Sequence, residues 1–96
     1  MRVRFLEIAE IELDEAIQYY NLEAPGLGDD FLFEVLNALD RIATFPEAWR
    51  ACSKRTRRGQ TRRFPYGIMY QILPGEILVV AIANLRKEPD YWEDRI

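Results

Sequence analysis

The chain has 96 residues, which is enough for one compact domain and excludes two independent ones. Hydrophobic residues make up 49% of it, which excludes intrinsic disorder and supplies one buried core. There is no histidine and one cysteine, Cys52, which excludes imidazole sites, thiolate clusters and intrachain disulfides. A reducing cytoplasm is therefore the expected compartment. No apolar run suits a membrane span or a signal peptide, so we expect no membrane partner.

The net charge of −3 hides a strong segregation of charge along the chain. Residues 1–49 contain 3 basic and 11 acidic side chains, whereas residues 50–72 contain 7 basic ones and no acidic one. Six of these seven are arginines, which suit bidentate contacts with phosphate or carboxylate. Because such a cluster repels itself, the segment predicts a surface for one anionic partner, either nucleic acid or an acidic protein segment. The alternative is a solvated charged surface.

The first half of the chain predicts a strand and two helices. Residues 2–7 alternate arginine with apolar residues, as in a short half-exposed strand. From Ala9 the apolar residues recur at helical spacing. The breaker-rich residues 23–28 predict a turn, and a second helix follows, with Asp29 and Asp30 in its first turn and Pro46 after its end. The short link favours an antiparallel helical hairpin.

The second half predicts three strands. Residues 56–64 fit a strand with one wet face, and residues 67–73 a strand that ends at the Pro74-Gly75 turn. The nearly continuous apolar run 78–83 is typical of a central strand. The order β-α-α-β-β-β predicts an α+β fold, a small twisted antiparallel sheet with the helical hairpin packed on one face. We expect the other face to carry arginines instead of a buried apolar layer.

Five stretches identify a family when they are taken in order: LDEAIQYY, PGLG before DDFLFEV, RRFPYGIMY, ILVVAIAN and LRKEPDYWEDR. With them the chain resembles the RelE/ParE toxin superfamily, most closely its plasmid-stabilisation-type members, over nearly its whole length. The resemblance implies that residues 1–96 form a single RelE/ParE-like toxin domain. It also implies the toxin of a type II toxin–antitoxin (plasmid stabilisation) module, neutralised by a cognate acidic antitoxin.

The resemblance leaves three activities open. The first is ParE-like growth inhibition, in which the toxin binds an essential target such as DNA gyrase. The second is RelE-like cleavage of mRNA on the ribosome, for which the resemblance implies three catalytic residues, Arg58, Arg86 (or Lys87 in its place) and Tyr91. The third is an inactive or repurposed protein-binding module.

Two departures from the RNA-cleaving pattern favour a toxin that is not itself catalytic. Gly67 stands where that branch has an arginine at the start of the third strand, and glycine has no side chain that could stabilise a charged transition state. Asn84 stands where plasmid-stabilisation relatives often have a histidine, and an amide does not transfer protons near neutral pH. We therefore expect the ParE-like activity first.

The antitoxin and the anionic target are both expected to bind the basic segment and the C-terminal region. The predicted contact residues are Arg55, Arg57, Arg58, Arg62, Arg63, Arg86 and Trp92. No cofactor, metal ion or small-molecule substrate is expected.

Overall fold

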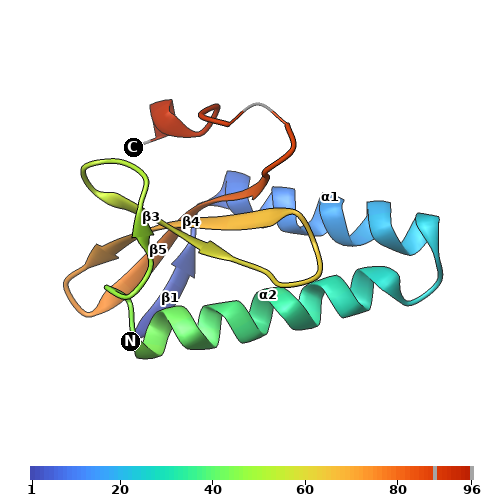
Figure 1. The fold of residues 1–96 in the computed structure, drawn as a ribbon, viewed down its shortest axis with the longest axis horizontal. Coiled ribbons are helices and arrows are strands. Elements are labelled where there is room, and N and C mark those ends of the chain that lie inside the picture. The colour runs from blue at the N-terminus through green and yellow to red at the C-terminus, as the bar shows by residue number, and fades with distance from the viewer. Residues whose placement is uncertain (88, 96) are drawn as a thin grey trace.

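The structure is a computed structural model that describes residues 1–87 and 89–95. In chain order its elements are β1 (Arg2–Phe5), α1 (Glu7–Glu23), α2 (Leu27–Thr44), β2 (Arg50–Ala51), β3 (Thr56–Gln60), β4 (Tyr66–Leu73), β5 (Glu76–Asn84) and the short 3-10 helix η1 (Glu93–Arg95). The five strands form one sheet in the order β1-β5-β4-β3-β2, with the two helices packed beside it (Figure 1). The predicted α+β fold with a helical hairpin on one face of the sheet is confirmed.

The pairing of β1 adds a detail that the sequence pattern did not predict. The β2–β3, β3–β4 and β4–β5 pairings are antiparallel as expected, whereas β1 runs parallel to β5. Arg2 lies opposite Glu76 in this register. The Glu76 carboxylate accepts hydrogen bonds from Arg4 at 2.9 Å and from Arg2 at 3.2 Å, and these contacts hold the pairing at the start of both strands.

A β-bulge in β5 gives the sheet two apolar faces. Met69 lies opposite Ala81 and Tyr70 opposite Val79, so Val80 is an extra residue without a cross-strand partner on β4. Such a bulge turns two successive side chains to one side of the sheet. Val80 and Ala81 accordingly pack in the same cluster, away from the helices.

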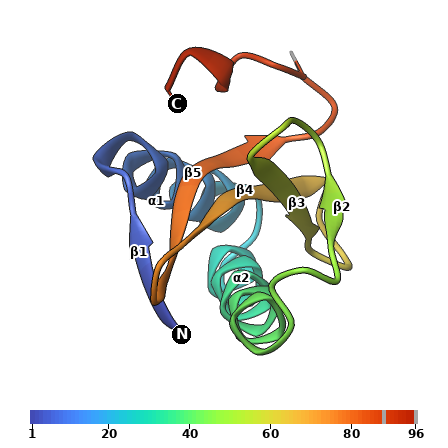
Figure 2. The same cartoon turned by 90° about the vertical axis from the view of Figure 1, so that its left-hand side faces the viewer.

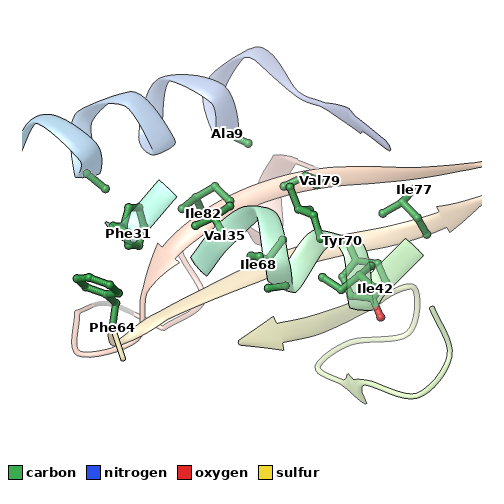
Figure 3. Packing of buried hydrophobic residues seen from close by; sticks show 13 residues of the cluster. Ala9, Phe31, Val35, Ile42, Phe64, Ile68, Tyr70, Ile77, Val79 and Ile82 are labelled. Atoms are coloured by element: carbon green, nitrogen blue, oxygen red, sulfur yellow. The ribbon is translucent and has the colours of Figure 1, made fainter. Parts of the chain in front are cut away.

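The main core lies between the sheet and the helices. Phe31, Val35 and Ile42 of α2 are fully buried against Ile68 and Tyr70 of β4 and their neighbours on β5 (Figure 3). Burying each large apolar side chain contributes about 1.5–3 kcal/mol relative to leaving it exposed.

A second, smaller cluster covers part of the opposite face, which was expected to carry arginines in place of a buried apolar layer. Trp92 is 1% exposed there and packs with Met69, Val80, Ala81 and Ala83. The C-terminal segment that brings it into place runs above the strands in Figure 2, away from α2. That expectation is therefore corrected over β5, because the C-terminal segment returns to bury the apolar side chains that the bulge exposes.

The helical hairpin depends on a close approach of the two helices. Gly26, with φ of 86°, makes the turn between them, a backbone conformation that glycine adopts without strain. Two residues later the N–H of Gly28 donates a hydrogen bond to Asn21 Oδ1 at 2.7 Å.

Among the described residues no helix is long and apolar enough to cross a membrane.

The first testable prediction concerns Gly28. A Cβ at this position would lie 2.1 Å from the carbonyl oxygen of Ile17 and 2.6 Å from Cγ of Asn21. Gly28→Ala should therefore push α1 and α2 apart and lower the free energy of unfolding by about 2 kcal/mol, measured by urea denaturation.

Gly67→Ala is the matched control, because it adds the same methyl group in a strand. Its Cβ would meet side-chain atoms of Leu85, Met69 and Arg58 at 3.0–3.2 Å, which can move aside. We expect a loss of less than about 1 kcal/mol. Equal losses in the two variants would contradict a special role of the helix contact.

Candidate functional site

The basic segment does not form one uniform surface, because strand register separates its members. Arg57 lies opposite Tyr70, whose side chain belongs to the core on the helix side of the sheet. The Arg57 guanidinium donates hydrogen bonds to the carbonyl oxygens of Trp49 at 2.7 Å and Glu47 at 3.1 Å. Arg57, a predicted contact residue, thus holds the loop that follows α2 and is not a free surface charge.

Arg58 points to the other face of the sheet. It lies opposite Met69 on one side and opposite Arg50 on the other. Like charges directly opposite each other in an antiparallel pair are destabilising. Within the described part of the chain, neither arginine forms an ion pair. This arrangement favours an anionic group beside the two guanidinium groups.

Arg62 and Arg63 lie in the loop between β3 and β4. Their backbone N–H groups both donate to Glu34 Oε1 of α2, at 2.9 and 3.0 Å, so the loop is anchored through its backbone. Their side chains are exposed. The guanidinium of Arg63 makes an exposed contact of 3.5 Å with Asp30 and lies over the Phe64 ring, 5.2 Å from its centroid. The anchored loop therefore presents two cationic side chains to a partner. Arg55, also exposed, lies with Lys54 beside a shallow cleft of about 370 Å³ at the β2–β3 turn.

A larger cleft of about 850 Å³ lies between α1, the loop before β4, the end of β5 and the C-terminal segment. Tyr20, Phe64 and Tyr66 line it. The ring centroid of Tyr20 lies 4.8 Å from that of Phe64 and 6.1 Å from that of Tyr66. Its cationic side chains are Arg63, Arg86 and Lys87. Burial raises the pKa of the Tyr20 hydroxyl, an effect that the charge of Arg86 partly offsets.

The structure brings some of the predicted residues together and separates others. Arg63, Arg86 and Tyr91 line the large cleft, but Arg58 does not, so the three residues implied for RNA cleavage do not share it. Trp92 was predicted as a contact residue, and its side chain is instead buried, with Nε1 donating to the carbonyl oxygen of Pro89 at 3.0 Å. It therefore has no surface to offer a partner.

A carboxylate that the sequence patterns did not single out organises one wall of this cleft. Glu12 of α1 accepts hydrogen bonds from Tyr91 Oη at 2.7 Å and from Arg95 Nη1 and Nη2, both at 2.9 Å. Its Oε1 also accepts the backbone N–H of Ile82 at 3.0 Å, and Arg95 Nη1 donates to the carbonyl oxygen of Val80 at 3.0 Å. Glu12 and Arg95 are 83 residues apart, so no local pattern could reveal their pairing.

The Glu12 contact also determines what Tyr91 can do chemically. Burial and the hydrogen bond to the Glu12 carboxylate hold the pKa of Tyr91 well above its usual value. The hydroxyl therefore keeps its proton near neutral pH and acts as a hydrogen-bond donor to Glu12.

The small α+β protein thus presents an exposed basic edge beside an aromatic, cation-lined cleft, a combination suited to an anionic macromolecule. Comparison with known proteins gives the family. A model of the family described as the ParE toxin of the type II toxin–antitoxin system parDE matches residues 3–89. The chain belongs to this toxin family, which confirms the resemblance drawn from the sequence.

A solved structure shows the same fold. A chain described as "Chromosomal ParDE TA system from P. aeruginosa" superposes with a TM-score of 0.78 at 16% sequence identity, covering 88% of this chain and 96% of that one. At this identity the similarity concerns the fold alone. No curated protein matches the chain.

The second prediction tests Glu12. Side chains of Glu12 and Arg95 are only 17% and 16% exposed, so Glu12→Gln leaves a largely buried guanidinium without its counter-charge. We expect a loss of about 2 kcal/mol in the free energy of unfolding by chemical denaturation. In the Glu12→Gln variant, Arg95→Met should lower the free energy of unfolding by less than it does in the unsubstituted protein.

Glu15→Gln is the control for this variant, since Glu15 is an exposed carboxylate on the same helix. It should change stability by no more than about 0.5 kcal/mol. If the two glutamate variants lost equal stability, the network around Glu12 would not be holding the C-terminal segment.

Proposed function

We propose that residues 1–96 form a ParE-like toxin that binds an acidic segment of its antitoxin along the basic edge of the sheet and inhibits growth by binding an essential target such as DNA gyrase. The observation that carries the proposal is the family match over residues 3–89. An exposed basic edge on a chain with a net charge of −3 supports the choice of surface.

Charge and anchoring support the docking of an acidic segment. Arg58, Arg62 and Arg63 extend from a strand and from a loop whose backbone is fixed to α2. Charge-assisted hydrogen bonds from guanidinium groups to carboxylates are stronger than neutral ones. A disordered acidic segment could therefore bind here, because these contacts would offset the entropy that the segment loses when it becomes ordered. Arg57 is left out of this surface because its Nη1 already donates to the backbone carbonyls of Glu47 and Trp49.

The site supports binding of a target more than cleavage of RNA. Tyr91 donates a hydrogen bond to Glu12, and its hydroxyl stays protonated near neutral pH because its pKa is raised. Arg58 does not line the cleft that contains Arg86 and Tyr91. Proton transfer and charge stabilisation in RNA cleavage need groups that converge on one phosphate.

The third prediction tests the docking surface. Arg58→Ala, Arg62→Ala and Arg63→Ala combined should weaken binding of the acidic antitoxin at least about tenfold at low salt, with less effect at high salt. Thermal stability should hardly change, because the exposed charges of Arg62 and Arg63 contribute about 0–1 kcal/mol each and the half-buried Arg58 forms no ion pair within the described chain. Affinity is measured by titration calorimetry and melting on the same preparation.

Two variants serve as controls. Arg2→Ala with Arg4→Ala removes positive charge from β1, which lies at the opposite edge of the sheet from β2, and should leave affinity unchanged. Arg57→Ala should lower stability by about 1–2 kcal/mol, since it leaves the carbonyls of Glu47 and Trp49 without their donor. An unchanged affinity of the triple variant at low salt would refute the proposed surface.

The fourth prediction concerns the target. Expression without the antitoxin should arrest bacterial growth, and the purified protein should inhibit supercoiling of DNA by gyrase. Ribosome-bound message should remain intact at the same protein concentration. Codon-specific cuts would instead establish the RelE-like activity, and normal growth with soluble folded protein would establish a repurposed binding module.

A further inference from the structure

The outer side of α1 presents large apolar side chains to solvent. Ile8 and Ile11 are each 44% exposed, Tyr19 is 56% exposed and Leu22 is 88% exposed. None of the four belongs to the apolar clusters that pack the described part of the molecule. Their spacing of three, eight and three residues places them on one side of the helix over about 21 Å of its length. We call these four residues the outer stripe of α1.

Spacing within the outer stripe suits a second helix. Ile8, Ile11, Glu15 and Leu22 follow one another at steps of three, four and seven residues, which is the a and d pattern of a helix–helix seam. The exceptions are Glu15, an exposed carboxylate in the middle of the apolar positions, and Gln18, an exposed amide at the next seam position. A helix packed over this side would cover Glu15 and would have to supply it with a cation.

The charge of α1 restricts what can cover it. The helix contains six acidic residues and no basic one. Among the described residues Glu12 is the one carboxylate of α1 that forms an ion pair. Acidic neighbours such as Glu7 and Glu10 repel each other at helical spacing, which a basic partner would relieve.

From this arrangement we infer that the outer stripe of α1 is a docking surface for a basic amphipathic helix of a partner protein. The partner helix places apolar side chains against Ile11 and Leu22 and a lysine or arginine opposite Glu15. Tyr19 and Glu15 also line the large cleft with Arg63, whereas Ile8, Ile11 and Leu22 do not. The outer stripe selects the opposite charge from the basic edge at β3. The inference does not depend on the antitoxin or on the growth-inhibiting target.

The same charges exclude two other occupants. A second copy of the chain packed through its own α1 in antiparallel orientation would bring Glu15 against Glu15 in the centre of the seam. Like charges in a desolvated contact cost free energy without a compensating partner. An acidic segment would meet six carboxylates along the helix and would be repelled.

The test uses synthetic helical peptides of about 18 residues, matched in length to the stripe. The first has leucine at the seam positions, lysine on its flanks and one lysine at the central seam position. A second replaces the seam leucines by serine at equal charge, and a third replaces the central lysine by glutamate. Fluorescence anisotropy gives the dissociation constants with the full chain. We expect the leucine peptide with central lysine to bind roughly tenfold more tightly than either of the others.

Variants of the protein locate the contact. Ile11→Ser with Leu22→Ser should weaken the first peptide roughly tenfold, whereas Phe33→Ser, which removes a 65% exposed side chain on α2, should not. Glu15→Lys should reverse the preference and favour the peptide with central glutamate. Asp14→Lys, the same charge change on an exposed neighbour off the stripe, should keep the original preference.

The outcomes decide the inference without depending on the folding of any single variant. Equal binding of the leucine and serine peptides would overturn it, because charge alone would then explain the association. An unreversed preference in Glu15→Lys would also overturn it, since the central position would not face Glu15. Binding of the leucine peptide that follows both the stripe variants and the charge reversal would establish the surface.

Discussion

The arrangement of the molecule depends on how β5 satisfies its backbone beyond Val79, the last residue paired with β1. Past that point the carbonyl of Val80 accepts a hydrogen bond from Arg95 Nη1, and the N–H of Ile82 donates one to Glu12 Oε1. Buried backbone groups without partners would cost several kcal/mol in total, at about 1–3 kcal/mol each. A helix and the C-terminal segment therefore complete an edge that a longer β1 would otherwise cover.

This constraint also shapes the surfaces that face partners. By holding Tyr91 and Arg95 to Glu12, it sets one wall of the large cleft and keeps Trp92 against the sheet. The cationic side chains then lie on the other walls and along β3, whereas α1 contains six carboxylates and no cationic residue. A short chain thus separates an acidic helix from a basic sheet edge.

Local patterns were enough to predict most of the elements. Helical spacing found both helices, and the apolar run 78–83 found the central strand, because burial on both faces removes polar residues from it. The two residues of β2 are too few for any periodicity. Parallel pairing of β1 with β5 depends on contacts more than 70 residues apart, such as Arg4 with Glu76.

Predicting the candidate site was harder, because charge patterns identify where cations are concentrated but not what they contact. Arg57 and Arg58 are neighbours in the sequence, yet the alternation of a strand sends one to backbone carbonyls and the other to an exposed face. Glu12 looked like one carboxylate among many on α1. Only the return of the C-terminal segment distinguishes it, and that return has no signature in the sequence.

The position of β5 has a consequence for the nascent chain. β5 lies between β1 and β4 in the sheet but is the last strand to be translated. Until Glu76–Val79 have emerged, β1 has no neighbouring strand, and the part of the main core that β5 supplies is missing. Long-range strand pairing is slow because the loop must close before any contact compensates for it. A product that ends before β5 therefore lacks the strand that joins β1 to β4, and with it the continuous sheet.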